Sequence, residues 1–413
     1  MLATYFKRQT TRTTYYASSA GPYLDEFADW LAKGGFHEEV ICQFLPGIVQ
    51  FADWADTTYG NLTSCPDDAC NHFRDHLAEL GRLHYAKGQH SASYRGALRF
   101  VKFLQLHHKI AGAAAPPQAT QPEIFRQFEQ WMQAHRGVRP ATLRNYQLHI
   151  VDLLKTLGEY PEQYTAAALY SSILNYAKGR SHELAKKRVT AIRMFIRFLI
   201  ATGRCQPGIE AAIPALAEWP LARLPRYLSV EDVDRVLVGT DDITPTGIRD
   251  KAILLLLARL GLRASEVAEL ALSDIDWSAG TFSVIGKSRR EAKLPLPQEV
   301  GDAVLKYLEF VRPSVETNRI FITAIAPWVP ITRYVVKQVA AHAIRRAGIN
   351  APSFGAHVLR HSAATGMLRQ GASLQVIGEV LRHRCLDTTA HYAKVDMRLL
   401  HQVIRPWPGE PSC

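Results

Sequence analysis

The stretch "GAHVLRHSAATGMLRQG" (Gly355–Gly371) combines an apolar helical pattern with one polar face. The apolar positions at helical spacing are Val358, Leu359, Met367 and Leu368. His357, Arg360 and His361 stand at positions i, i+3 and i+4, so a helix places all three on one side. Two imidazoles and a guanidinium are too polar for a helix face that packs in a core. They suit a phosphate, which arginine binds through two parallel hydrogen bonds. The stretch therefore predicts a helix with an anion-binding face.

A second arginine lies at a predicted helix junction, in "LARLGLRASEVAEL" (Leu257–Leu270). One helix is expected to end at Gly261 and the next to begin near Ala264, which places Arg263 between them. A surface arginine is the plain interpretation of this position. Apolar neighbours make a partly buried guanidinium the alternative, and such a group needs an anionic partner. Glu266 or a bound phosphate would meet that need.

The alternating run "GTFSVIGKSRREAKLPLP" (Gly280–Pro297) predicts a β-hairpin with a charged turn. Phe282 and Val284 fall on one face of the hairpin. Lys287 falls on the turn, where a long, flexible ammonium group can reach over a neighbouring cleft.

A fourth segment, "LQVIGEVLRHRCLDTTAHY" (Leu374–Tyr392), predicts one helix that ends at His383 and a short helix after it. Asp387 or Thr388 is the expected N-cap of the short helix, which places Tyr392 in its second turn. A lone histidine or tyrosine usually has a packing role, so the order of all four segments decides the interpretation.

Taken in order, the segments supply an arginine, a hairpin lysine, a His-x-x-Arg pair, a histidine and a tyrosine. This series resembles the tyrosine recombinases, the family of phage integrases and Xer-type recombinases. The similar strings are "GLRASEVAEL", "VIGKSRREAKLPLP", "HVLRHSAAT" and "LRHRCLDTTAHYAKV", and the similarity covers residues 227–395. The four motifs occur in order with family-like spacing, which makes the resemblance specific. Residues 120–205 are similar to the family's core-binding domain in pattern alone.

The resemblance implies a role for each matched residue. The implied catalytic residues are Arg263, Lys287, His357, Arg360, His383 and Tyr392, with Glu266 and His361 in support. The two arginines would clamp a phosphate, Glu266 would buttress Arg263, and Lys287 would be the general acid for the 5′-oxygen. A phenol has a pKa of about 10 and is a weak nucleophile, but surrounding cations stabilise its phenolate and the charge that develops at phosphorus. Tyr392 would attack a DNA phosphodiester and form a 3′-phosphotyrosine, without a metal, ATP or another cofactor.

The chain departs from the family pattern at two positions. It has Leu381-Arg382-His383 where the family usually has Leu-Gly-His, so we expect a differently shaped turn and an added DNA contact from Arg382. His391 precedes the tyrosine where threonine is more frequent. Neither change removes a reacting group.

Two breaks divide the chain into three expected domains. Residues 111–121, "AGAAAPPQATQ", have the composition of a linker, and four prolines interrupt residues 205–229. The expected domains are an N-terminal helical domain at 1–110, a core-binding helical domain at 115–205 and a catalytic domain at 222–413. The first is a candidate diverged copy of the second, because "FADWLAKGGF" shares its Phe-x-x-Trp start with "FEQWMQAHRG". Chance similarity between amphipathic helices is the alternative.

The helix predicted from "HELAKKRVTAIRMFIRFLIATG" (His182–Gly203) carries charges of almost one sign. A charged helix face is usually only solvated, but a face of one sign favours a phosphate backbone. The residues expected to bind DNA are Lys186, Lys187, Arg188 and Arg193.

Composition bounds the class of protein. Lys plus Arg outnumber Asp plus Glu by 49 to 38, for a formal charge of +11, which favours a polyanionic partner such as nucleic acid or an anionic membrane surface. The most apolar run, residues 252–262, is too short to span a bilayer and is expected to be a buried helix. No apolar run follows the basic N-terminus, and six cysteines are too sparse for a disulfide framework, so we expect a cytoplasmic protein. Cys65, Cys70 and His72 lack a second ligand cluster, which favours reduced thiols over zinc.

The prediction from sequence is a mainly α protein. It has helical N-terminal bundles and an α+β tyrosine-recombinase catalytic domain with a small β-hairpin or sheet. The resemblance implies a site-specific recombinase or integrase of a mobile element, acting on double-stranded DNA as a homo- or hetero-tetramer on two sites. The alternatives are relaxation of DNA like a type IB topoisomerase, or a non-catalytic DNA-binding accessory role. The amphipathic segment Val395–Ile404 is expected to dock on a neighbouring protomer, with folding back on its own domain as the alternative.

Overall fold

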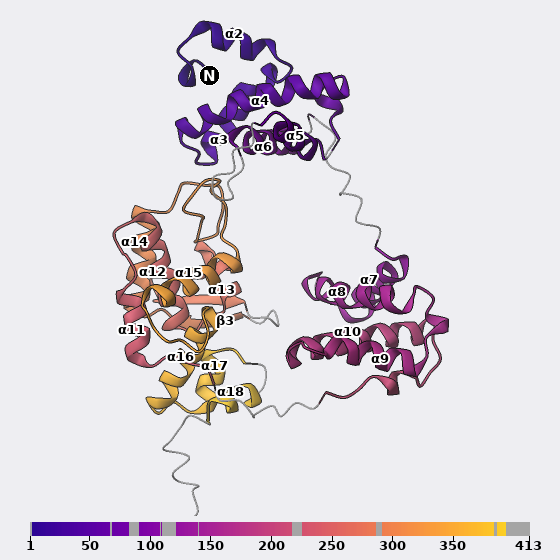
Figure 1. Cartoon of the computed structure of the whole chain (residues 1–413). Coiled ribbons are helices and arrows are strands. Elements are labelled where there is room, and N and C mark those ends of the chain that lie inside the picture. The colour runs from indigo at the N-terminus through magenta and orange to yellow at the C-terminus, as the bar shows by residue number, and fades with distance from the viewer. Residues whose placement is uncertain are drawn as a thin grey trace, which may run out of the picture. The chain divides into compact units, whose positions relative to one another are not determined.

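The computed structural model describes residues 2–66, 68–81, 91–107, 109, 121–138, 140–216, 225–285, 291–383 and 386–393. Helices dominate these residues, together with a small three-stranded sheet (Figure 1), which confirms the predicted fold class. Two compact units are present: Met1–Leu62 with Cys70–Phe103 and Pro220–Cys413, and Thr63–Ala69 with Leu104–Trp219. The expected domain boundaries stay predictions. None of the described helices is both long and apolar enough to cross a membrane.

Aromatic side chains hold the first helices of the chain together. These helices are α1 (Leu2–Tyr5), α2 (Gln9–Ala17), α3 (Gly21–Lys33), α4 (Glu38–Tyr59), α5 (Ala69–Glu79) and α6 (Ala92–Leu106). Phe27 of α3 contacts Phe100 and Phe103 of α6, with ring centroids 5.2 and 5.4 Å apart. Helices α4 and α6 approach closely at Gly47, where a β-carbon would lie 2.2 Å from Cα of Ser93. A larger residue at this position would force the two helices apart.

Four α-helices form the described part of the unit that contains Leu104–Trp219. They are α7 (Glu123–Arg136), α8 (Pro140–Leu157), α9 (Ala166–Ala177) and α10 (His182–Ala201). Gly137 and Gly158 follow α7 and α8 with φ of 56° and 87°, a backbone conformation that glycine adopts without steric penalty. Phe128 of α7 lies at the centre, with its ring 5.6 and 5.7 Å from those of Phe195 and Phe198 on α10.

Arg188 belongs to the interior of this unit, so the prediction that it binds DNA is wrong. Its side chain is 2% exposed and is ion-paired with Asp152. The guanidinium donates a hydrogen bond to Oγ of Ser172 at 3.2 Å and lies 4.1 Å from the ring centroid of Tyr176. The physical reason is helical phase, because Arg188 follows the buried Ala185 by three positions on the inner face of α10.

The other basic residues predicted on α10 have different environments. Lys187 is exposed and pairs with Glu183 at 2.9 Å, and Lys186 is half-buried. Arg193 is half-buried and donates to the carbonyl of Pro214 at 3.5 Å. For these three residues DNA binding stays a prediction.

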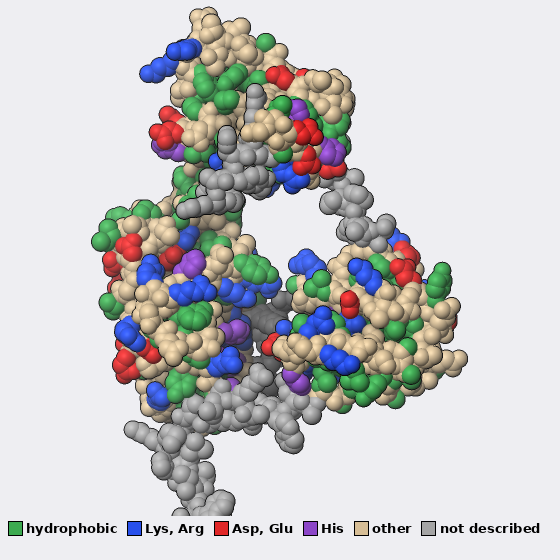
Figure 2. Space-filling view, in the orientation of Figure 1, with side chains coloured by type: hydrophobic (Ala, Val, Ile, Leu, Met, Phe, Trp, Pro, Cys, Tyr) green, Lys and Arg blue, Asp and Glu red, His purple; other side chains and the backbone are tan. Residues whose placement is uncertain are grey.

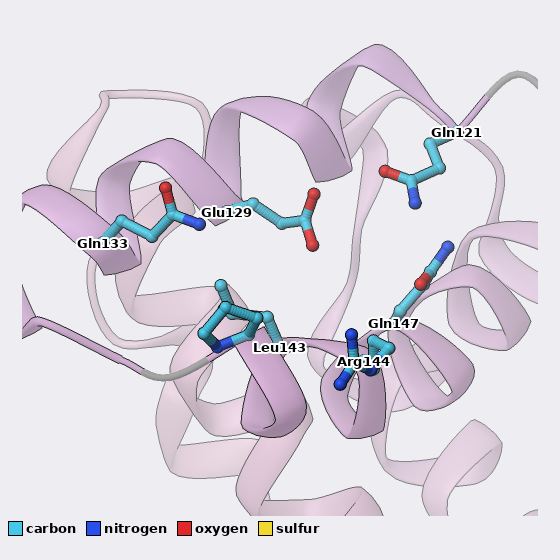
Figure 3. Close-up of a pocket in the computed structure, with 7 residues that line it drawn as sticks. Gln121, Glu129, Gln133, Leu143, Arg144 and Gln147 are labelled. Atoms are coloured by element: carbon cyan, nitrogen blue, oxygen red, sulfur yellow. The ribbon is translucent and has the colours of Figure 1, made fainter. Parts of the chain in front are cut away.

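An open hollow lies between α7 and α8 (Figure 3). Its volume is about 500 Å³, and its labelled lining residues are Gln121, Glu129, Gln133, Leu143, Arg144 and Gln147. Glu129 and Arg144 bring opposite charges to this space, and burial raises the pKa of Glu129. The lining is therefore mixed in charge.

The part of the chain after Arg226 is organised around one buried helix. Its helices are α11 (Val230–Val238), α12 (Pro245–Ala258), α13 (Ala264–Glu269), α14 (Gln298–Phe310), α15 (Arg333–Arg346), α16 (Ala356–Arg369), α17 (Leu374–Val380) and α18 (Leu386–Ala393). Helix α12 packs against α14, α15 and α16 and is buried on every side from Ala252 to Ala258. The expectation that the apolar run forms a buried helix is confirmed.

The predicted hairpin is present in a sheet of three antiparallel strands. They are β1 (Ile275–Asp276), β2 (Thr281–Ile285) and β3 (Glu291–Pro295), in the order β1-β2-β3. Phe282 pairs with Leu294, and both Phe282 and Val284 are buried on the same face, as predicted. Lys287 lies outside the described residues.

Arg188→Ala should lower the free energy of unfolding by about 2 kcal/mol, because it removes a buried guanidinium with its ion pair and hydrogen bond. Lys187→Ala, its exposed neighbour, should change stability by less than about 0.5 kcal/mol. Scanning calorimetry of both variants measures the difference. Wild-type stability of Arg188→Ala, together with a shallower salt dependence of DNA binding, would show instead that Arg188 contacts phosphate.

Candidate active site

Helix α16 carries Arg360 into the interior of the protein. Arg360 is 4% exposed, and its two terminal nitrogens donate to the main-chain carbonyls of Gly261 and Leu381. Burial, together with the charge of Arg263, lowers the pKa of Arg360 to about 10, so the guanidinium stays protonated at neutral pH. A fixed positive charge therefore lies where the end of α12 meets the turn after α17.

The turn between α12 and α13 requires a glycine. Gly261 has a φ of 60°, and a β-carbon there would lie 2.6 Å from Cδ2 of Leu381. The turn brings Arg263 to the N-cap position of α13. Helix α13 begins at Ala264 as predicted, whereas α12 ends at Ala258, earlier than predicted.

One buried carboxylate, that of Glu266, binds two arginines. Its side chain is 4% exposed, and Oε1 accepts from Nη1 of Arg263 at 2.6 Å. Oε2 accepts from the backbone N–H of Arg263 at 2.8 Å and from Nη2 of Arg382 at 2.6 Å. Burial by itself would raise the pKa of Glu266, but the charge of Arg382 and the hydrogen bonds from Arg263 outweigh burial and hold the pKa below its usual value. The ionised carboxylate fixes the orientation of Arg263.

The side chain of Arg382 points inward, so the expected DNA contact is wrong. It is 7% exposed, and besides Glu266 it contacts the carbonyl of Val380, to which Nη1 donates at 2.9 Å. The physical reason is the buried carboxylate of Glu266, whose Oε2 pairs with the guanidinium of Arg382 inside the protein. The carbonyl of Arg382 also accepts a hydrogen bond from Nη2 of Arg263 at 3.5 Å.

Tyr392 enters this region from α18. It is 2% exposed, and its hydroxyl lies 2.8 Å from Nδ1 of His361 on α16. Its ring stacks on His383, with centroids 6.3 Å apart and planes at 8°. Burial raises the pKa of Tyr392, and the charges of Arg360 and Arg263 oppose that shift.

The histidines of the site are held mainly in their neutral form. Burial and the neighbouring His357 lower the pKa of His361 to about 4. Burial and the charge of Arg360 likewise lower the pKa of His383 to about 4. His383 is fixed by Thr389, whose Oγ1 lies 2.7 Å from its Nδ1. His357 is exposed, with its ring 5.9 Å from that of His361.

The sequence is similar to known proteins along nearly its whole length. Residues 226–398 match the phage integrase family. The chain is 33% identical over 396 residues to the integrase/recombinase y4rA of Sinorhizobium fredii (strain NBRC 101917 / NGR234), a match that covers 94% of each protein. This chain is a tyrosine recombinase of the phage integrase family. It is also 31% identical over 281 residues to the tyrosine recombinase XerC of Alcanivorax borkumensis, with 65% of this chain and 88% of that relative covered.

Solved structures show the same fold. The XerH site-specific recombinase bound to palindromic difH substrate has a TM-score of 0.56 and 18% identity, over 73% of this recombinase and 92% of that chain. A lambda integrase (75-356) dimer bound to a COC′ core site has a TM-score of 0.54 and 18% identity, over 67% of this recombinase and 96% of that chain. At such low identity these matches establish the fold and leave residue roles to the geometry.

The recombinase brings together most of the residues that the sequence analysis singled out. The gathered residues are Arg263, Glu266, Arg360, His361, His383 and Tyr392, with His357 at the rim. The hairpin lysine is outside the described residues, and its role stays a prediction. Among the described residues no group of three or more His, Cys, Asp or Glu side chains is placed to hold a metal ion.

Two participants were missed, and three helix boundaries differ from the prediction: α12 ends at Ala258, α17 ends at Val380 and not at His383, and α18 begins at Leu386. Arg382 stands in the motif, but its inward orientation depends on a turn that helical periodicity does not describe. Thr389 lies beside His383 on α18, which begins at Leu386, whereas the predicted N-cap was Asp387 or Thr388. Asp387 and Thr388 therefore lie within the helix and are not its N-cap.

The half-buried His361 and His383 should make folding sensitive to mild acid. The folded protein keeps His361 and His383 neutral down to about pH 4, whereas the unfolded chain takes up protons near the ordinary histidine pKa of about 6.5. The unfolded state therefore binds more protons, and the melting temperature should fall as pH drops from about 6.5 towards 4. His361→Gln should flatten this dependence between about pH 6.5 and 5, where the carboxyl groups of ordinary pKa are still ionised. An equally steep fall in wild type and variant would contradict the account.

Proposed function

We propose that this recombinase recognises a specific double-stranded DNA site and cuts and rejoins its strands, with Tyr392 as the nucleophile. The observation that carries the proposal is the position of the Tyr392 hydroxyl, bonded to a neutral histidine and within the field of two fixed guanidinium groups. A phenol needs such surroundings to react at neutral pH, because cations stabilise both its phenolate and a transition state with charge on phosphorus.

Arg263 and Arg360 have donors left for a phosphate. A guanidinium carries five N–H groups, and the contacts with protein atoms occupy only some of them. The Arg263 side chain is 28% exposed, which keeps part of it open to a ligand. We therefore assign the two arginines to the scissile phosphate, with His357 and His383 as further hydrogen-bond partners at its edge.

The chemistry follows from these positions. The Tyr392 oxygen attacks phosphorus and forms a phosphotyrosine at a 3′ end, while the bond from phosphorus to the 5′-oxygen breaks. Nδ1 of His361 accepts the phenolic proton as the new bond forms, and Lys287 supplies a proton to the departing 5′-oxygen. The new ester retains the energy of the broken bond, so a 5′-hydroxyl from a second strand reverses the step and completes strand exchange.

The relatives support DNA as the partner and a multimer as the working form. Similar structures include a lambda integrase tetramer bound to a Holliday junction and a Tn1549 transposon integrase in complex with transposon right end DNA. We propose that this recombinase likewise assembles as a tetramer on two DNA sites and serves a mobile element in the cytoplasm. Lys186, Lys187 and Arg193 are its proposed backbone contacts, and the charge of +11 favours such a partner. Figure 2 shows blue basic side chains on one face of both compact units.

Tyr392→Phe should bind a labelled, nicked DNA site with wild-type affinity and form no covalent adduct, because only the hydroxyl is lost. A denaturing gel detects the adduct, and a gel shift measures affinity. Tyr307→Phe is the matched control, since its buried hydroxyl bonds to the main chain of Ile322 away from the site; it should retain the adduct. An adduct formed by Tyr392→Phe would exclude Tyr392 as the nucleophile.

A further inference from the structure

Arg382 adopts a backbone conformation that its side chain opposes. Its φ is 56°, and among the described residues no other non-glycine residue has a positive φ. L-residues with a β-carbon rarely adopt this region, and glycine adopts it freely. A strained conformation persists where surrounding contacts enforce it, so the contacts of Arg382 should explain its presence.

Two of those contacts join Arg382 to the pair formed by Arg263 and Glu266. Nη2 of Arg382 donates to Oε2 of Glu266 at 2.6 Å, across 116 positions of sequence. The main-chain carbonyl of Arg382 accepts from Nη2 of Arg263 at 3.5 Å. One residue thereby touches both members of the pair, one through its side chain and the other through its backbone.

The same turn also contacts the rest of the site. The carbonyl of Leu381 accepts from Arg360, and His383 is the next residue after Arg382. The backbone N–H of His383 is bonded to the carbonyl of Gly378 at 2.9 Å, which holds the turn against α17. Fixing Arg382 therefore fixes the turn relative to α13.

We propose that Arg382 is a positioning residue, which orients Glu266 and, through it, the phosphate-binding face of Arg263. Its guanidinium occupies Oε2 of Glu266, so that Oε1 remains with Nη1 of Arg263. The link also holds the turn that carries His383 at a fixed place beside α13. This inference rests on the proposed function of Arg263 and Tyr392. Because only 7% of the Arg382 side chain is exposed, this side chain does not reach DNA directly in this arrangement.

A double-mutant cycle tests the inference in the full-length chain. Arg382→Gly suits the backbone conformation and removes the guanidinium, Glu266→Gln keeps the shape and removes the charge, and the third protein carries both changes. The measured quantities are the rate of covalent adduct formation at saturating DNA and, separately, the affinity for DNA. Each single change should slow adduct formation at least about tenfold and leave affinity within about threefold, because the defect is in orientation at the phosphate. The double variant should be no slower than the slower single variant.

Arg259→Ala is the matched control for loss of an arginine ion pair. Arg259 pairs with Asp234 and Glu299, and its side chain is 35% exposed. When Arg259→Ala is combined with Glu266→Gln, the defect in adduct rate should equal the product of the two single defects, as expected for independent sites. Arg382→Lys keeps the charge but replaces the planar group with a single ammonium, so it should recover part of the rate.

Two results would overturn the inference. One is a wild-type rate for Arg382→Gly; the other is a double variant whose defect is the product of the two single defects. If circular dichroism shows that Arg382→Gly does not fold, Arg382→Lys takes its place in the cycle. A double variant whose rate defect is the product of the two single defects would then overturn the inference as well. Failure of the proposed function looks different, because Tyr392→Phe would then form the adduct in the same gels.

Discussion

The buried carboxylate of Glu266 is the constraint on which the catalytic region depends. Three guanidinium groups, those of Arg263, Arg360 and Arg382, converge on this region. Glu266 binds two of them, and main-chain carbonyls hold the third. Buried cations need compensating charge, and one carboxylate does not compensate three. The excess positive charge is what a phosphodiester would neutralise.

The same excess of positive charge influences the protonation state of the neighbouring groups. It helps to keep His361 and His383 neutral, so His361 is able to accept a hydrogen bond from Tyr392 at physiological pH. Burial raises the pKa of the phenol, and the two arginines work against that effect. The site thus combines an enclosed nucleophile with the charges that would activate it, and both depend on the positions of α13, α16 and α18.

Sequence patterns predicted the features that arise from local periodicity. The face formed by His357, Arg360 and His361 and the buried side of the β2–β3 hairpin follow from spacings of 3.6 and 2 residues. Arg188 was misassigned because charge alone does not reveal which side of a helix a residue occupies. Arg382 was misassigned because its positive φ and its partner far along the chain are properties of the folded turn. Long-range ion pairs of this kind leave no periodic trace.

The central claim is that the arginines stabilise negative charge at the scissile phosphate, and a neutral substrate tests it most directly. In a methylphosphonate, a methyl group replaces one charged oxygen, so less charge remains for a guanidinium to neutralise. Removing one preorganised donor typically slows reaction about 10²–10³-fold, and Arg263→Ala should show a loss of this order on the phosphate substrate. On the methylphosphonate, the ratio of wild-type to Arg263→Ala adduct rates should be at least about tenfold smaller. An equal loss on both substrates would contradict charge stabilisation by Arg263.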